Sequence, residues 1–312
     1  MKRSTAVWLI IGGVLILAGA IIFCTVMSML NWNFKSLDTN KYETNVYESD
    51  KSVGEVKIDV TTADVTFKPS DDGKIKVVCY ENTKIRYTVT VDNGVLTITE
   101  NDYRKWYDHI GIKSDSPRID VYLPTASGYA IDMDITTGDV SIAKDFKLLD
   151  VEIRVTTGDV KCLASSAESI KIENTTGDVT IENTIVEKDV YVHYTSSDVT
   201  MRNVTVGEHT YIKGSTGDVA FHGGFGADLN VKITTGDVKL DNFDAREMNV
   251  ETTTGDVTGT LRTSKLFTVD TTTGDVTVEK YIQGYECKVK TTTGDVSIEC
   301  LAIDEAGPFW WQ

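Results

Sequence analysis

Apolar and polar residues alternate along most of the chain after residue 50, and from residue 131 the alternation repeats with a nearly constant period. Each repeat contains the pentapeptide Thr-Thr-Gly-Asp-Val or a close variant. A period that holds to within one residue keeps side chains in fixed columns only if each repeat is one coil stacked on the next. The pattern therefore predicts an all-β fold, a single-stranded β-solenoid of about 19–20 residues per coil over 131–303. The column of repeat aspartates comprises Asp139, Asp159, Asp178, Asp198, Asp218, Asp237, Asp256, Asp275 and Asp295.

Two buried series within each repeat predict a corner at Gly-Asp. The residues eight and six positions before the aspartate, such as Val151 and Ile153, form one inward series, and the valine after the aspartate begins another of opposite parity. Because a one-residue shift of parity moves side chains to the other face, the chain must bend between the two series. Glycine tolerates the positive φ angle expected there, whereas Ser197 predicts a strained or differently shaped corner. The predicted corner residues are Gly138, Gly158, Gly177, Ser197, Gly217, Gly236, Gly255, Gly274 and Gly294.

The segment before the array predicts a different β arrangement. Residues 51–130 alternate like half-buried strands, and Asp92-Asn93-Gly94 between two of them is typical of a tight hairpin. We expect an antiparallel β region there that covers the first edge of the solenoid. Residues 31–50 are polar and predict a juxtamembrane stalk, and residues 304–312 predict a C-terminal cap or tail.

One segment is apolar enough to cross a membrane. Residues 7–30 contain no charged side chain, and as a helix they reach about 36 Å, against a hydrocarbon layer of about 30 Å. A cleaved signal peptide is the alternative, but its apolar core is usually only about 7–15 residues long, so we favour a single-pass anchor. Lys2 and Arg3 predict that residues 1–6 stay in the cytoplasm and that the C-terminal domain is extracytoplasmic.

The charge balance excludes nucleic acid as a partner. Only two of the 31 basic residues precede the apolar segment, so the remainder carries 29 basic and 47 acidic residues, a net charge of −18. Such a surface repels polyanions and attracts cations or cationic peptides. The same charge also keeps a β surface soluble. Cys162 and Cys287 are expected to be small core residues, and no spacing typical of a zinc site occurs.

The aspartate column poses an electrostatic problem. Carboxylates about 4.8 Å apart repel by roughly 0.9 kcal/mol per pair in water. Either each carboxylate accepts hydrogen bonds from the amides of its own turn, or the column binds cations such as Ca²⁺. We favour the first, because calcium-binding β-rolls use a shorter repeat with more glycine. No cofactor is predicted, and Ca²⁺ is kept as the alternative.

Two groups of residues are candidates for binding a partner. Tyr191, His193 and Tyr211 share the outer face of adjacent coils and are suited either to a sugar or peptide or to an ordinary aromatic pair. Trp106 and Tyr107 lie in a segment without strand periodicity, which predicts either a contact with a partner or lipid headgroup, or a hairpin tip. The partner classes are thus an envelope protein, a glycan or a cationic peptide.

The sequence contains no recognisable catalytic motif. The four histidines occupy unrelated columns, and a carboxylate present in every coil indicates architecture rather than catalysis. We therefore predict no enzyme, but a membrane-anchored binding or scaffold module in adhesion or cell-envelope stress sensing. The alternatives are a polysaccharide-active β-solenoid enzyme and a calcium-stiffened structural spacer.

The periodic pentapeptide, the segment from Val56 to Phe67 and Val121-Tyr122-Leu123-Pro124 carry a family resemblance. Over roughly 45–303 the chain resembles the bacterial putative-adhesin, toast-rack-like family of β-strand repeats, whose function is unknown. The resemblance implies a β-solenoid displayed at the cell envelope, linked in some relatives to stress signalling or to sensing of antimicrobial peptides. It implies no catalytic residues. Some relatives lack an N-terminal anchor, so the membrane prediction rests on residues 7–30.

Overall fold

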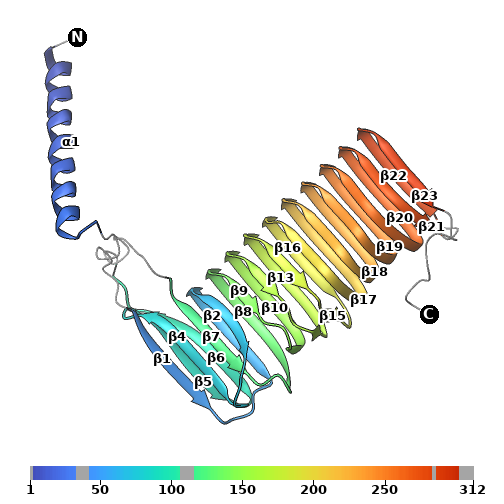
Figure 1. Cartoon of the computed structure of the whole chain (residues 1–312), viewed down its shortest axis with the longest axis horizontal. Helices are drawn as coiled ribbons and strands as arrows, with labels where there is room; N and C mark the ends of the chain where they lie inside the picture. The colour runs from blue at the N-terminus through green and yellow to red at the C-terminus, as the bar shows by residue number, and fades with distance from the viewer. Residues whose placement is uncertain (1–2, 33–41, 106–115, 283–285, 302–312) are drawn as a thin grey trace.

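The computed structural model describes residues 3–32, 42–105, 116–282 and 286–301 as one helix and a long stack of strands (Figure 1). The elements are α1 (Arg3–Met29), β1 (Tyr42–Ser49), β2 (Glu55–Thr62), β3 (Asp64–Pro69), β4 (Ile75–Asn82), β5 (Ile85–Asp92), β6 (Val95–Asp102), β7 (Arg118–Leu123), β8 (Gly128–Thr137), β9 (Val140–Ile142), β10 (Lys147–Thr157), β11 (Val160–Cys162), β12 (Ser166–Ala167), β13 (Ser169–Thr176), β14 (Val179–Glu182), β15 (Ile185–Val186), β16 (Val190–Ser196), β17 (Val199–Thr216), β18 (Val219–Thr235), β19 (Val238–Thr254), β20 (Val257–Thr273), β21 (Val276–Ile282), β22 (Glu286–Thr293) and β23 (Val296–Leu301).

The predicted solenoid is confirmed. Strands of successive coils pair in parallel, as β10 does with β8 and β13, so equivalent positions lie above one another. The valine that follows each aspartate forms a single row, and from Val140 to Val276 each of these side chains is at most 1% exposed. Dry, aligned rows of this kind supply the hydrophobic stabilisation that no coil has alone.

Each coil turns three times. The first corner is Gly-Asp, as predicted, and the corner glycines have φ between 121° and 151°. A second bend follows five residues after the aspartate, where Asn183, Asn203 and Asn242 have φ of 54°, 50° and 53°. Asparagine is one of the few residues that adopt this left-handed conformation readily. A third corner, near residues 187–189 and 207–209, returns the chain to the long side of the coil.

The region over 51–130 covers the first edge, but its strands are not simply antiparallel. β2 and β3 pair in parallel with β8 and β9, so they form a complete coil that precedes the array. β6 and β7 continue the stack in parallel beyond them, and only β1, β4 and β5 run antiparallel to their neighbours. The degenerate copy at Thr61–Val65 is therefore a true corner, although more than 70 residues separate it from the array.

The prediction of a stalk over residues 31–50 is wrong for residues 42–49. Tyr42–Ser49 is strand β1, which pairs with β4 along its whole length. Its composition is polar because it is an edge strand, in which half of the side chains are exposed and none is fully buried. The predicted hairpin is confirmed: Asp92 pairs with Val95, and Asn93 and Gly94 have φ of 49° and 81°.

The cysteines differ in burial. Cys162 is fully buried, and burial raises the pKa of its thiol to about 11. Burial likewise raises the pKa of Cys79 to about 12, so neither is a ready thiolate nucleophile. Cys287 was expected in the core but is exposed, because it lies on the last described coil, where a further coil no longer covers the inward positions.

Helix α1 is apolar on all sides and has no core to pack against. Leu15, Ile16 and Leu17 are consecutive, so they point in different directions, yet each is at least 65% exposed. The stretch Ile10–Met29 is long and apolar enough to cross a membrane. Two residues that follow the helix, Asn31 and Trp32, have positive φ, and the Trp32 ring packs edge-on against Phe23.

Candidate binding surface

The Gly-Asp corners join the coils through a hydrogen-bond ladder. In each coil the aspartate Oδ1 accepts the backbone N–H of the aspartate in the next coil, and nine such bonds of 2.7–3.2 Å run from Asp64 to Asp295. The expectation that each carboxylate binds amides of its own turn was wrong in this respect. The acceptor reaches across to the following coil because the corner holds equivalent residues directly above one another. Each amide dipole offsets part of the repulsion between neighbouring carboxylates.

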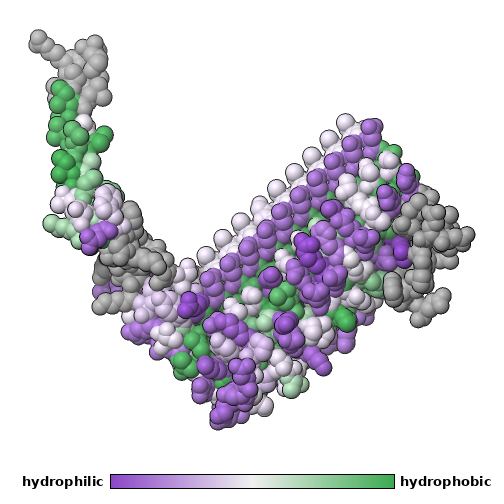
Figure 2. All heavy atoms as spheres, in the orientation of Figure 1, coloured by the Kyte–Doolittle hydropathy of each residue, from purple (hydrophilic) through white to green (hydrophobic). Residues whose placement is uncertain are grey.

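The ladder makes the corner an ordered acidic edge. One oxygen of each carboxylate is occupied by the ladder, and the side chains remain exposed, next to two columns of exposed threonine or serine hydroxyls such as those of Thr156 and Thr157. Figure 2 shows the result as straight rows of like residues along one long edge. In the described part of the chain, the column brings no three carboxylates to a common point within ligand distance. The ladder therefore accounts for the column without a cation, and calcium stays an untested alternative.

Removing the charge of one ladder carboxylate tests this account. In Asp237→Asn the amide oxygen still accepts the Asp256 N–H while repulsion falls, so stability should stay within about 0.5 kcal/mol of wild type or rise. Asp237→Ala leaves that N–H without its acceptor and should cost about 1 kcal/mol. Thermal melts of the two variants check the difference. If asparagine destabilised the protein as much as alanine, charge rather than hydrogen bonding would be the essential property.

The corner without glycine has a different shape. Ser197 is not at positive φ, its side chain is buried, and the bond from the Asp198 N–H to Asp178 is the longest in the ladder, at 3.2 Å. The neighbouring Tyr194 points inward and is 2% exposed, and burial raises the pKa of its hydroxyl. Its ring fills the space beside Gly214, where a Cβ would lie 2.0 Å from Cζ of the ring. Ser197 in place of glycine predicts an altered corner, but nothing in the repeat indicates the inward tyrosine that accompanies it.

The structure brings Tyr191 and Tyr211 together. Their rings are stacked with centroids 5.3 Å apart and an angle of 6° between planes. Each ring therefore covers one face of the other. Only the ring edges and the two outward ring faces remain for contact with a ligand. His193 lies on the same outer face, opposite Lys213 in the next coil. This geometry suits a polar partner better than a sugar ring that needs a broad aromatic face.

A shallow depression adjoins this patch. It has a volume of about 300 Å³ and crosses four coils. Charged and polar side chains line it, and it is open to solvent. Its outer wall comprises Asp134, Arg154, Glu173 and His193, and its floor includes Asn174 and Tyr194. Trp106 and Tyr107, the other predicted partner contacts, lie outside the described residues.

Ion pairs between coils fix the charged columns. Lys232 pairs with Glu251 as the predicted register requires, and Lys290 lies 3.4 Å from Asp270. Arg154 contacts Asp132 and Asp134 of the preceding coil, whereas Glu173 pairs with Lys171. The hydrogen bond from Lys232 is the chief cause that holds the pKa of Glu251 below its ordinary value. The outer surface therefore carries ion pairs between adjacent coils, each worth at most about 1 kcal/mol because the side chains are exposed.

These features define a β-solenoid with one apolar N-terminal helix, whose coils are joined at acidic corners. The chain belongs to the Toastrack DUF4097 family, which it matches over residues 53–188 and 164–307. No curated protein matches it.

Solved structures of low sequence identity resemble the chain over most of its length. A putative adhesin from Parabacteroides merdae is 13% identical, with a TM-score of 0.47 and coverage of 84% of this chain and 97% of that chain. A putative lipid binding protein from Parabacteroides distasonis is also 13% identical, with a TM-score of 0.47 and coverage of 83% and 97%. A putative cell adhesion protein from Clostridium sporogenes is 7% identical, with a TM-score of 0.31 and coverage of 84% and 100%.

Proposed function

We propose that this protein is a non-enzymatic binding module, anchored by α1 with its solenoid outside the membrane, whose acidic surface binds a cationic polypeptide in adhesion or cell-envelope stress sensing. The observation that carries the proposal is the ladder of aspartates along one edge of a solenoid whose chain has a net charge of −16. A straight row of fixed charges attracts a polycation over a long contact and needs little reorganisation on binding.

Membrane anchoring is supported by the exposed apolar surface of α1. A soluble protein rarely exposes a helix that is apolar on every face. Lys2 and Arg3 precede the helix, which favours a cytoplasmic N-terminus and an extracytoplasmic solenoid. Retention of the helix in the mature protein belongs to the same proposal.

The uniformity of the ladder favours binding over catalysis. A retaining glycosidase needs two carboxyl groups about 5–5.5 Å apart with different protonation roles. Here the carboxylates from Asp64 to Asp275 each accept one equivalent amide, so no pair is distinguished from the others.

Binding of a lysine- and arginine-rich peptide to the full chain in detergent tests the proposal. We expect saturable binding that weakens at least about 10-fold between 50 and 500 mM salt, because screening shortens the reach of surface charge. Asparagine at Asp159, Asp237 and Asp275 together should weaken binding at low salt and leave the fold intact. A matched triple variant in the N-terminal cap, Glu48→Gln with Asp71→Asn and Asp92→Asn, removes the same charge elsewhere and should bind like wild type. Equal losses in both variants would mean that net charge alone, and not the ladder edge, attracts the peptide.

A further inference from the structure

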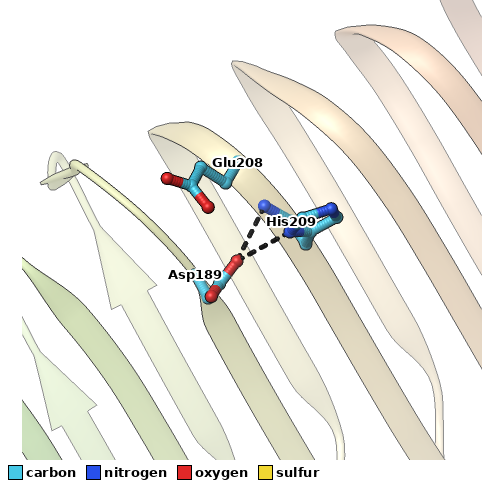
Figure 3. Close-up of side chains that lie close together, drawn as sticks. All are labelled: Asp189, Glu208 and His209. Atoms are coloured by element: carbon cyan, nitrogen blue, oxygen red, sulfur yellow. Dashed lines mark hydrogen bonds and ion pairs between the residues drawn. The ribbon is translucent and has the colours of Figure 1, made fainter.

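The third corner holds a cluster that the repeat does not explain. Ligand atoms of Asp189, Glu208 and His209 all lie within 4.8 Å of one another, and the three side chains are exposed (Figure 3). The Asp189 Oδ1 accepts the backbone N–H of His209 at 3.1 Å and lies 2.9 Å from its Nδ1. In Figure 3 the Glu208 carboxylate lies above that of Asp189 and is joined to neither partner.

The third corner creates this arrangement, and a β-bulge toward the following coil adjoins it. The pairing of β17 with β18 shifts register between Val206 and His209, so two residues of one coil face one residue of the next. Gly207, Glu208 and His209 are therefore all exposed, although neighbours in a regular strand point to opposite faces. Gly207 is required because a Cβ there would lie 2.1 Å from the Glu187 carbonyl oxygen. Val206 pairs with Val186 and Thr210 with Val190, so this corner is in register with the preceding coil, and that register places His209 opposite Asp189.

The neighbouring coils show what an ordinary third corner contains. Lys188 pairs there with Glu168, Arg246 with Asp228 at 2.8 Å, and Lys265 with Glu247. Each is a permanent cation facing a carboxylate of an adjacent coil. In the coil of His209 an imidazole takes this place, and Lys188, whose charge interacts with Glu208, forms its ion pair with Glu168 instead. Two carboxylates thus face one imidazole at this corner.

We propose that Asp189, Glu208 and His209 form a site for a divalent transition metal, with Zn²⁺ as the best-suited ion. An imidazole with two carboxylates is a donor set that zinc accepts, whereas Ca²⁺ requires six to eight oxygens. Two ligands on a tetrahedral zinc lie about 3.3 Å apart, close to the 2.9 Å between Nδ1 and Oδ1. The exposed Glu208 closes the remaining distance by rotating its side chain. The two carboxylates balance the charge of the ion, and the exposed side leaves a position for water or a partner's donor atom.

A fourth residue positions the imidazole. The Asp228 Oδ2 lies 3.8 Å from Nε2 of His209, on the side of the ring away from Asp189. At this distance the carboxylate attracts an Nε2–H without a direct hydrogen bond, and a small rotation of the ring would complete one and favour the tautomer that leaves Nδ1 free to bind metal. Arg246 in turn holds Asp228 through a bidentate ion pair. Asp228 is thus a positioning residue and not a ligand.

Zinc titration of the full chain in detergent, followed by calorimetry at pH 7.4 with excess Mg²⁺ and Ca²⁺, tests the site. We expect a zinc site that His209→Ala weakens at least 10-fold and that Glu208→Gln also weakens. Asp228→Asn should weaken it about 10-fold while preserving the number of ions bound. His222→Ala is the matched control, because His222 faces a single carboxylate, Asp241, at 3.3 Å. Thermal melts without metal confirm that each variant is folded.

Three results would overturn the proposal. The first is no zinc binding beyond that shared with Mg²⁺ and Ca²⁺. The second is full-strength binding in His209→Ala, which would place the zinc elsewhere in the chain. The third is an equal loss in His222→Ala, which would indicate nonspecific binding by surface histidines.

Discussion

Replacing Gly255 by alanine should destabilise the solenoid by about 3 kcal/mol or more, although the change adds one methyl group at the surface. The added Cβ would lie 1.8 Å from the Gly236 carbonyl oxygen in the preceding coil, and the φ of 146° is one that alanine rarely adopts. Neither problem can be relieved locally, because the obstructing atom belongs to the backbone of a coil that is itself fixed on both sides. We expect the thermal midpoint to fall by roughly 6–12 °C.

Gly54 provides the matched control. No atom lies within 4 Å of the Cβ that alanine would add there, and its φ is not positive. Gly54→Ala should therefore melt within about 2 °C of wild type. A Gly255→Ala variant that melted like Gly54→Ala would show that the coils can separate at a corner, and the rigid-stack description would have to be abandoned.

Substituting isoleucine for both Tyr194 and Gly214 should lower the stability of the protein far less than either substitution alone. Tyr194→Ile leaves unfilled space beside Gly214 and should cost about 2–3 kcal/mol. Gly214→Ile drives a side chain into the tyrosine ring and should cost at least as much, because the added Cβ alone would lie 2.0 Å from Cζ. In the double variant, the two isoleucines occupy the position that Ile135 and Ile233 occupy in other coils. Most of the lost stability should therefore be recovered.

A double-mutant cycle on thermal or denaturant unfolding measures this coupling. We expect a favourable interaction of about 2–3 kcal/mol between the two substitutions. Strictly additive losses would mean that the tyrosine and the glycine are not structurally linked. The altered corner at Ser197 would then need a separate cause.

The solenoid could be predicted from the sequence because the same motif recurs in every coil. Valine follows the aspartate in every repeat, so one misjudged position cannot change the period, and the parity argument placed the Gly-Asp corner correctly. The coil formed by β2 and β3 was harder to place. Its Asp64 precedes the array by 75 residues, and only the folded chain shows that the strands between them are stacked on the other side.

The candidate sites were less predictable because they depend on departures from the repeat. The partner of each ladder carboxylate is an amide in another coil, which local turn chemistry does not reveal. The cluster at His209 was missed because histidine columns were compared only by their distance from the repeat aspartate. The signal was the sequence Gly207-Glu208-His209, in which polar residues interrupt the alternation between Val206 and Ile212.

The hydrogen bonds of the aspartate ladder all point the same way, from the amide of a later coil to the carboxylate of an earlier one. If folding proceeds from the N-terminus, each new coil thus meets an acceptor that is already in place, beginning with Asp64 in the N-terminal cap. Folding that starts at the N-terminal cap would add one coil at a time in the order of synthesis. Only the most recently added coil would then have unpaired strands that could mispair.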